Sequence, residues 1–141
     1  MLIGEHYHNL DPKGRVSIPS KFRDDLGGTF VLSKGLDNCL YAYSLAEWDG
    51  SQQELLSLRG KDGQRVRRFF FSGASDCEID AQGRVVIPPA LREHAELKKE
   101  VVIIGNSNRA EIWNKENWEK YIMDSSFESE EIADAMERLG L

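Results

Sequence analysis

The sequence lacks the patterns in which cysteine and histidine usually build disulfide frameworks or metal sites. Only two cysteines occur among 141 residues, Cys39 and Cys77, and they form no C-x-x-C pair. Two isolated cysteines predict reduced structural thiols rather than a disulfide framework or a zinc site. His6 and His8 share one face of a predicted strand, but no third ligand lies near them in the sequence. We therefore expect no bound metal and no cofactor.

Long apolar segments and phosphate-binding loops are missing as well. The longest apolar runs, such as Val101–Ile104, are far too short to cross a bilayer, and no basic stretch leading into apolar residues opens the chain. No glycine-rich phosphate loop occurs, and His94 has no nucleophile at a useful spacing. These absences predict a cytoplasmic protein with no enzymatic activity, no small-molecule substrate and no membrane association.

Basic residues are too few to balance the acidic ones, and the formal net charge is −6. The whole excess lies in residues 111–141, which hold nine acidic and three basic side chains, so residues 1–110 are neutral. Within that neutral part, the stretch Arg59–Arg68 carries five basic residues and one acidic residue. Overall acidity therefore does not exclude a basic surface. The stretch fits equally well with a phosphate-tracking surface and with a solvated or inter-subunit helix face.

The strongest signal that the sequence does contain is a duplicated motif. Asp11–Arg23 and Asp80–Arg92 share seven of thirteen residues: Asp, Gly, Arg, Val, Ile, Pro and a second Arg. Each copy opens with Asp-x-x-Gly, in which Asp accepts a backbone N–H and Gly adopts the left-handed conformation. Such a turn is a favoured β-hairpin connection. The alternating apolar residues after each glycine predict a short strand, which a proline ends.

The likeness of the two halves continues beyond the motif. A short helix is expected after each proline, the first capped by Ser20 with Phe22 and Leu26 buried, and the second opened by Pro89. Leu91 and Ala95 are the matching buried residues of the second helix. Two buried strands and the start of another helix then follow in each half. The expected strands are Phe30–Leu32, Leu40–Tyr43, Val101–Ile104 and Glu111–Trp113, and the equivalent helix starts hold Trp48 and Trp118.

A helical connector and an acidic tail complete the expected organisation. Ser44 is predicted to cap the connector, and Gly60–Gly63 to interrupt it. A repeat this short cannot bury its own apolar face, so the two copies should pack together as a pseudo-twofold α+β fold. The expected units are a hairpin domain at 5–48, the connector at 49–75, a second hairpin domain at 76–118 and an amphipathic tail at 119–141.

These motifs resemble the MraZ family of bacterial transcriptional regulators. The resemblance rests on two Asp-x-x-Gly-Arg turns that each run into Val-x-Ile-Pro, on "FFFSGASDCEIDAQGRVVIP" and on "VVIIG…EIW", and it covers nearly the whole chain. Each half also resembles the swapped-hairpin DNA-binding domain of the AbrB type. The resemblance thus implies an intrachain pseudo-dimeric AbrB-like β-barrel with peripheral helices.

The resemblance also implies a function and its residues. It implies a nucleoid-associated regulator of the division and cell-wall gene cluster, with repression as the favoured mode, that binds promoter DNA as a ring-like homo-oligomer. Asp11 with Arg15, and Asp80 with Arg84, are the implied DNA-reading pairs. Lys13 in the first turn corresponds to the neutral Gln82 in the second, so the two turns are not expected to bind DNA equally.

The chemistry of these residues suits DNA. A two-stranded ribbon fits the major groove, and Arg can bind guanine O6 and N7 with about 1–3 kcal/mol of discrimination. Many weak hairpins linked in an oligomer larger than a dimer should prefer short direct repeats. A surface turn whose Arg only pairs with its Asp is the plainer interpretation. Two others are an antitoxin-like protein-binding module whose acidic tail occupies a partner, and a metal-dependent hydrolase using His6 and His8.

Overall fold

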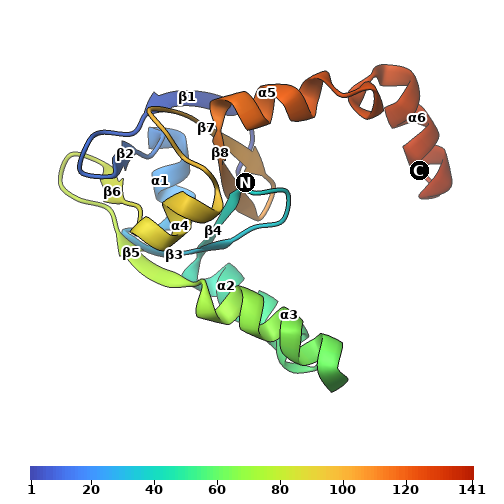
Figure 1. The fold of residues 1–141 in the computed structure, drawn as a ribbon, viewed down its shortest axis with the longest axis horizontal. Helices are drawn as coiled ribbons and strands as arrows, with labels where there is room; N and C mark the ends of the chain where they lie inside the picture. The colour runs from blue at the N-terminus through green and yellow to red at the C-terminus, as the bar shows by residue number, and fades with distance from the viewer.

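The computed structural model describes residues 1–141 and contains two antiparallel sheets surrounded by helices (Figure 1). The strands are β1 (Glu5–Asn9), β2 (Arg15–Ser17), β3 (Thr29–Lys34), β4 (Leu40–Ser44), β5 (Ser75–Glu78), β6 (Arg84–Val86), β7 (Glu100–Asn106) and β8 (Arg109–Asn114). The helices are α1 (Ser20–Leu26), α2 (Leu45–Leu56), α3 (Gly60–Ser72), α4 (Pro89–His94), α5 (Lys115–Met123), the 3-10 turn η1 (Ser125–Phe127) and α6 (Ser129–Arg138). The α+β class expected from the sequence is confirmed.

The larger sheet has six strands in the order β1-β7-β8-β4-β3-β5, with all neighbours antiparallel. Each copy contributes its first strand to the other copy, since β1 pairs with β7 and β5 pairs with β3. The sheet is open, with β1 and β5 as its edges, so the expected closed barrel is wrong. The strands that follow the two turns are only three residues long and end before Pro19 and Pro88, which cannot extend a ladder.

The second sheet is a two-stranded ribbon made of β2 and β6. Its register is symmetric about Val16 and Val85, which face each other, and Arg15 lies opposite Val86. Two further backbone bonds extend it: Ile18 N–H donates to the Gly83 carbonyl at 2.9 Å, and Ile87 N–H to the Gly14 carbonyl at 2.8 Å. The strand after each turn therefore has the other copy's strand as its ladder partner, and not the strand that precedes its own turn.

The two faces of the larger sheet bury different cores. One face packs against the ribbon, α1 and α4, and its core includes Phe22, Leu26, Leu91 and Ala95, all at most 2% exposed, as the sequence predicts. The other face carries an aromatic cluster with Trp48 on α2, together with these residues of the sheet and of α5: Tyr41, Tyr43, Trp113 and Trp118. Strand β3 shows the division: Phe30, Val31 and Leu32 are all buried, but Phe30 and Leu32 belong to the first core and Val31 to the second, because neighbouring side chains of a strand point to opposite faces.

Two predicted helix boundaries change in the structure. Pro19 occupies the N-cap of α1 and no side chain caps it, so the predicted Ser20 cap is wrong: Ser20 already lies inside the helix. Ser44 does cap α2, accepting a hydrogen bond from the Glu47 N–H at 3.2 Å. The predicted interruption of the connector occurs, but at residues 57–59 between α2 and α3; its predicted position, Gly60–Gly63, is wrong, because these residues begin α3. Gly63 is needed inside α3, where a side-chain carbon would lie 2.9 Å from the Leu58 carbonyl carbon.

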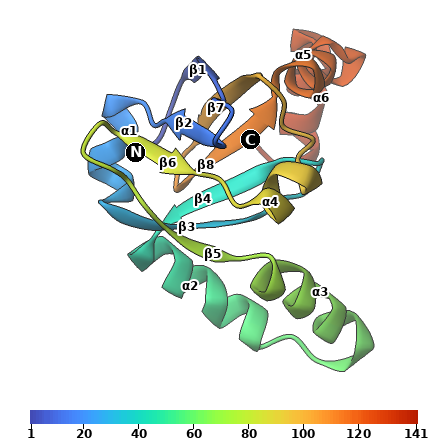
Figure 2. The same cartoon turned by 60° about the vertical axis from the view of Figure 1, so that its left-hand side comes forward.

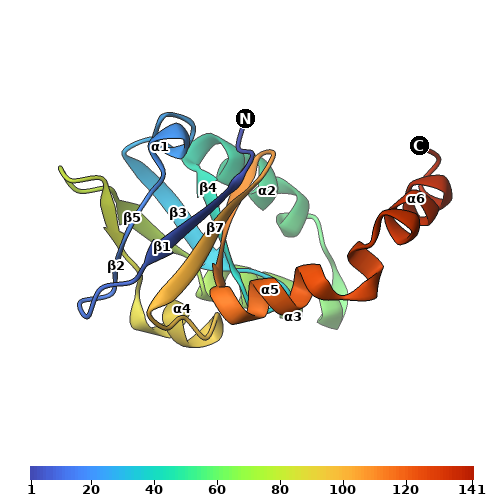
Figure 3. The same ribbon diagram turned by 90° about the horizontal axis from the view of Figure 1, so that it is seen from above.

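Two parts of the chain project from this body. Helices α2 and α3 form a pair that extends away from the sheet, and Arg67 donates to the Leu58 carbonyl near its far end (Figure 2). After α5, η1 and α6 lead away from the sheet to the C-terminus (Figure 3). None of the residues of α6 is buried. The structure contains no helix with the length and hydropathy needed to span a membrane.

Candidate nucleic-acid interface

The two Asp-x-x-Gly turns lie at the same end of the molecule. They are the loops that precede β2 and β6 at the left of Figure 1, and α6 lies at the opposite end. Both glycines have a φ of +79°, the left-handed conformation that the sequence pattern predicts. The pairing of β2 with β6 fixes the two turns relative to each other through the ribbon.

The Asp and Arg of each turn contact each other directly. Asp11 Oδ1 accepts hydrogen bonds from the N–H groups of Lys13 and Arg15, both at 2.9 Å, and its Oδ2 accepts from Arg15 Nε at 2.6 Å. One carboxylate thus shapes the turn and holds the guanidinium. Arg15 uses only Nε within the protein, which leaves its two Nη atoms without a hydrogen-bond partner. The side chain is 29% exposed.

The second turn repeats this arrangement. Asp80 Oδ1 accepts from the N–H groups of Gln82 and Arg84 at 2.9 Å, and its Oδ2 accepts from Arg84 Nε at 3.1 Å. The backbone N–H of Arg84 is the main cause that lowers the pKa of Asp80, as that of Arg15 lowers the pKa of Asp11. Both carboxylates are therefore ionised at neutral pH and able to hold a guanidinium.

Arg23 and Arg92 had no role predicted from the sequence, and they lie against the turns. Arg23 on α1 lies against Gly83 of the second turn, and Arg92 on α4 lies against Gly14 of the first. Each arginine therefore contacts the turn of the opposite copy. The sequence did contain a sign of this role, because this arginine is the last of the seven residues that the two copies of the motif share.

The basic stretch Arg59–Arg68 does not join the turns. It lies on α3, which Figures 1 and 2 place away from the ribbon. Arg65 pairs with Asp62 at 3.4 Å, and both side chains are mostly exposed. Because an exposed pair of this kind contributes little to stability, Arg65 can leave it to contact another molecule.

The other groups singled out in the sequence have structural surroundings. His6 packs edge-on against Phe22. The pKa of His8 is lowered, mainly by burial and to a smaller extent by the nearby His6 and Arg23. No group of three His, Cys, Asp or Glu side chains is arranged to hold a metal ion. Cys39 and Cys77 are both buried, and neither forms a disulfide.

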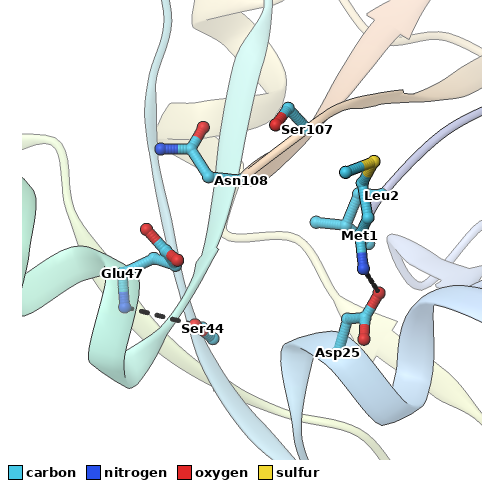
Figure 4. Close-up of a pocket in the computed structure, with 7 residues that line it drawn as sticks. All are labelled: Met1, Leu2, Asp25, Ser44, Glu47, Ser107 and Asn108. Atoms are coloured by element: carbon cyan, nitrogen blue, oxygen red, sulfur yellow. Dashed lines mark hydrogen bonds and ion pairs between the residues drawn. The ribbon is translucent and has the colours of Figure 1, made fainter.

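A surface hollow lies beside the N-terminus (Figure 4). Its lining residues are Met1, Leu2, Asp25, Ser44, Glu47, Ser107 and Asn108. Some of its polar groups have partners in the protein: the Met1 ammonium pairs with Asp25 Oδ2 at 2.7 Å, and Ser44 Oγ caps α2. The arrangement contains no nucleophile held by a base, so it does not resemble a catalytic site.

One protein-family model matches both halves of the chain. The family model described as "MraZ protein, putative antitoxin-like" matches residues 1–69 and again residues 70–139. The chain belongs to the MraZ family. Proteins named transcriptional regulator MraZ from Caldicellulosiruptor saccharolyticus and Alkaliphilus oremlandii are each 54% identical to it, and one from Alkaliphilus metalliredigens is 51% identical. Each of these alignments covers 100% of both chains, which confirms the family inferred from the duplicated turns.

Proposed function

We propose that this MraZ-family protein is a sequence-specific DNA-binding regulator of transcription, which reads bases with Arg15 and Arg84. The observation that supports this best is the duplicated Asp–Arg turn, presented twice at one end of the molecule. A structural ion pair alone would not need two copies in matched positions on one ribbon. The names of the relatives, transcriptional regulator MraZ, agree with this role.

In the proposed complex, the major groove of DNA receives the β2–β6 ribbon end of the molecule together with the two turns. The groove is about 12 Å wide and accepts a two-stranded β-ribbon. Arg15 and Arg84 would contact guanine with the Nη atoms that they leave unpaired, while Asp11 and Asp80 hold the Nε side of each guanidinium. Holding the side chain before binding reduces the entropy lost on binding. Lys13 and Gln82 are placed to contact phosphate or neighbouring bases.

The distribution of charge supports the same orientation on DNA. Lys13, Arg15 and Arg92 outweigh Asp11 at the first turn, for a net charge of +2. At the second turn, Arg84 and Arg23 against Asp80 give a net charge of +1. The acidic residues of α6 lie at the far end of the molecule (Figure 1). Attraction to phosphate supplies much of the affinity of DNA-binding proteins, and it would draw the turns to DNA first.

We further propose that the protein acts as a ring-like homo-oligomer larger than a dimer, on short direct repeats in promoter DNA. Helix α6 exposes Ile132 and Met136 at 41% and 45%, and its first turn holds Glu130 and Glu131. Helix α3 would offer the complementary surface, where Arg65 and Arg68 lie beside the partly exposed side chains of Val66, Phe69 and Phe70, with Asp62 the one acidic residue among them. A contact between α6 of one subunit and α3 of the next subunit is head-to-tail, so a series of such contacts can close into a ring.

The proposed biological setting rests on the resemblance to the family. The proposed targets are promoters of the division and cell-wall gene cluster, with repression as the favoured outcome. This role would place the protein in the cytoplasm, on the nucleoid. Because successive subunits of a ring face the same way around it, direct repeats suit them better than palindromes, and linked contacts raise avidity by roughly 10²–10⁴.

The test combines DNA affinity with the mass of the free protein. Binding is measured by fluorescence anisotropy on fragments from upstream of the protein's own gene, with one to four repeats, and mass by light scattering. Affinity should rise steeply with repeat number, and Met136→Glu should reduce both mass and affinity. Met123→Glu is the matched control, because Met123 is 82% exposed outside α6. A monomer that binds one repeat as tightly as several would overturn the proposal.

A second candidate is an antitoxin-like protein-binding module, which the exposed acidic helix α6 favours. In that case α6 would receive a different protein rather than a second copy. The same experiment separates the two functions. A Met136→Glu variant that keeps the mass and DNA affinity of the unmodified protein would exclude α6 from self-assembly and favour the second candidate.

A further inference from the structure

The duplicated motif ends in an arginine that the proposed DNA contacts do not use. Arg23 and Arg92 hold equivalent positions on α1 and α4, and neither forms an ion pair in the protein. Each guanidinium lies against a turn glycine of the opposite copy. If Gly14 carried a side-chain carbon, that atom would lie 2.8 Å from Arg92 Cζ, and one on Gly83 would collide with the Arg23 guanidinium.

The backbone contacts of the two glycines cross between the copies in the same way. Gly83 accepts a hydrogen bond from Ile18 N–H at 2.9 Å, and Gly14 accepts one from Ile87 N–H at 2.8 Å. Gly83 of the second copy thus contacts Arg23 and Ile18, which both belong to the first copy. Gly14 of the first copy is contacted in the same way by the arginine and the isoleucine of the second copy. Arg15 and Arg84 directly follow these glycines, so the position of each glycine decides where the proposed DNA-reading side chain starts.

We infer that Arg23 and Arg92 are crossed positioning residues: Arg92 of the second copy supports the first DNA-reading turn, and Arg23 of the first copy supports the second. The role rests on the proposed function, since it acts through Arg84 and Arg15. The position of the supporting arginine also means that two separate constraints favour glycine at residues 14 and 83. A side chain there would be strained by the positive φ and would displace the supporting guanidinium.

The two supports differ in how firmly they are held. Arg23 Nε donates to the Ile18 carbonyl at 2.9 Å, which ties its guanidinium to the strand end of its own copy. Arg92 Nε is buried and has no hydrogen-bond partner. Arg23 is therefore the more firmly held of the two supports.

Double-mutant cycles on DNA affinity test the crossed assignment. Arg23→Gln should weaken binding roughly threefold to tenfold, and this loss should vanish when Arg84→Ala is already present. The same change should add fully to Arg15→Ala. Arg92→Gln should show the mirror pattern, coupled to Arg15→Ala and additive with Arg84→Ala. Lys21→Gln removes one charge from an exposed position on α1 and is the control for bulk electrostatics.

Hydrogen exchange on the free protein gives a second readout that does not depend on DNA. Arg23→Gln should speed exchange in peptides covering 80–84 and leave those covering 11–15 unchanged, and Arg92→Gln should do the reverse. Coupling to the turn of the same copy, or equal effects on both turns, would overturn the inference. If Arg15→Ala and Arg84→Ala leave DNA affinity unchanged, the proposed function fails, and the exchange pattern still decides whether the support is crossed.

Discussion

The two turns have the same backbone and different chemistry. Both glycines have a φ of +79°, and both aspartates accept the same two backbone hydrogen bonds at 2.9 Å. The Asp–Arg contact is 2.6 Å in the first turn and 3.1 Å in the second. The first turn also carries Lys13 where the second has Gln82, and its supporting Arg92 lacks the Nε hydrogen bond that Arg23 makes.

This comparison separates what each residue type does. The features that the turns share depend on Asp and Gly, which fix the backbone within a few residues of the chain. The difference in residue type, Lys13 against Gln82, lies on exposed side chains, where a change costs the fold little. A duplicated motif can therefore keep one shape while its two copies come to recognise different stretches of DNA.

Removing both guanidiniums should have the largest effect. We expect the Arg15→Ala and Arg84→Ala double variant to lose sequence-specific binding, because each contact contributes about 1–3 kcal/mol of discrimination and the losses multiply in an oligomer. Gel-shift titration against promoter and unrelated DNA measures the loss, and thermal denaturation should show a folded protein. Unchanged affinity for the promoter would refute base reading by these arginines.

Changes at Asp11 should separate the shape of the turn from the orientation of Arg15. Asp11→Asn keeps an acceptor for the two backbone N–H groups, so it should lose mainly the hold on the guanidinium. Asp11→Ala should lose both functions and bind DNA more weakly than Asp11→Asn. Anisotropy titrations of the two variants, beside the same pair at Asp80, provide the comparison. Equal loss in both variants would argue against a turn-forming role.

Exchanging Lys13 and Gln82, the residues that differ between the two turns, should alter the salt dependence of DNA binding more than the affinity itself. Lys13→Gln should lower the slope of log affinity against log salt by about 1 if Lys13 contacts phosphate, and Gln82→Lys should raise it by about 1. Titrations at several salt concentrations measure the slopes, with Lys21→Gln as the control. A slope that stays constant in both variants would place these side chains away from the DNA backbone.

Acid should produce the smallest effect and should act on both turns. Backbone N–H groups, mainly those of Arg15 and Arg84, lower the pKa of Asp11 and Asp80 below 3.8 in the folded protein. A lowered folded-state pKa contributes stability that is complete above pH 3.8 and lost as the pH falls through the folded-state value. The stability gap to an Asp11→Asn, Asp80→Asn variant should therefore shrink upon acidification. Thermal melting at stepwise lower pH checks this, and a widening gap would contradict it.

Much of the site was predictable because its interactions are local. Asp11 reaches the N–H of Lys13 and the guanidinium of Arg15 within five consecutive residues, so the sequence pattern contains all the partners. Ser44 was predictable as a cap for the same reason. The Ser20 cap failed although it is local, because Pro19 has already taken the extended conformation of the N-cap, with ψ of 135°.

The sequence alone determined the repeat, the two turns, the buried faces of the short helices and the family. These depend on residue spacing along the chain and on local hydrogen bonds. Only the tertiary structure decided which strands pair, that the larger sheet stays open, and that Arg23 and Arg92 support the opposite turns. The physical reason is that a strand exposes the same unpaired N–H and C=O groups whatever its partner. The choice of partner is made when both copies bury their apolar faces in one core, which brings Gly14 and Arg92 into contact across 78 residues of chain.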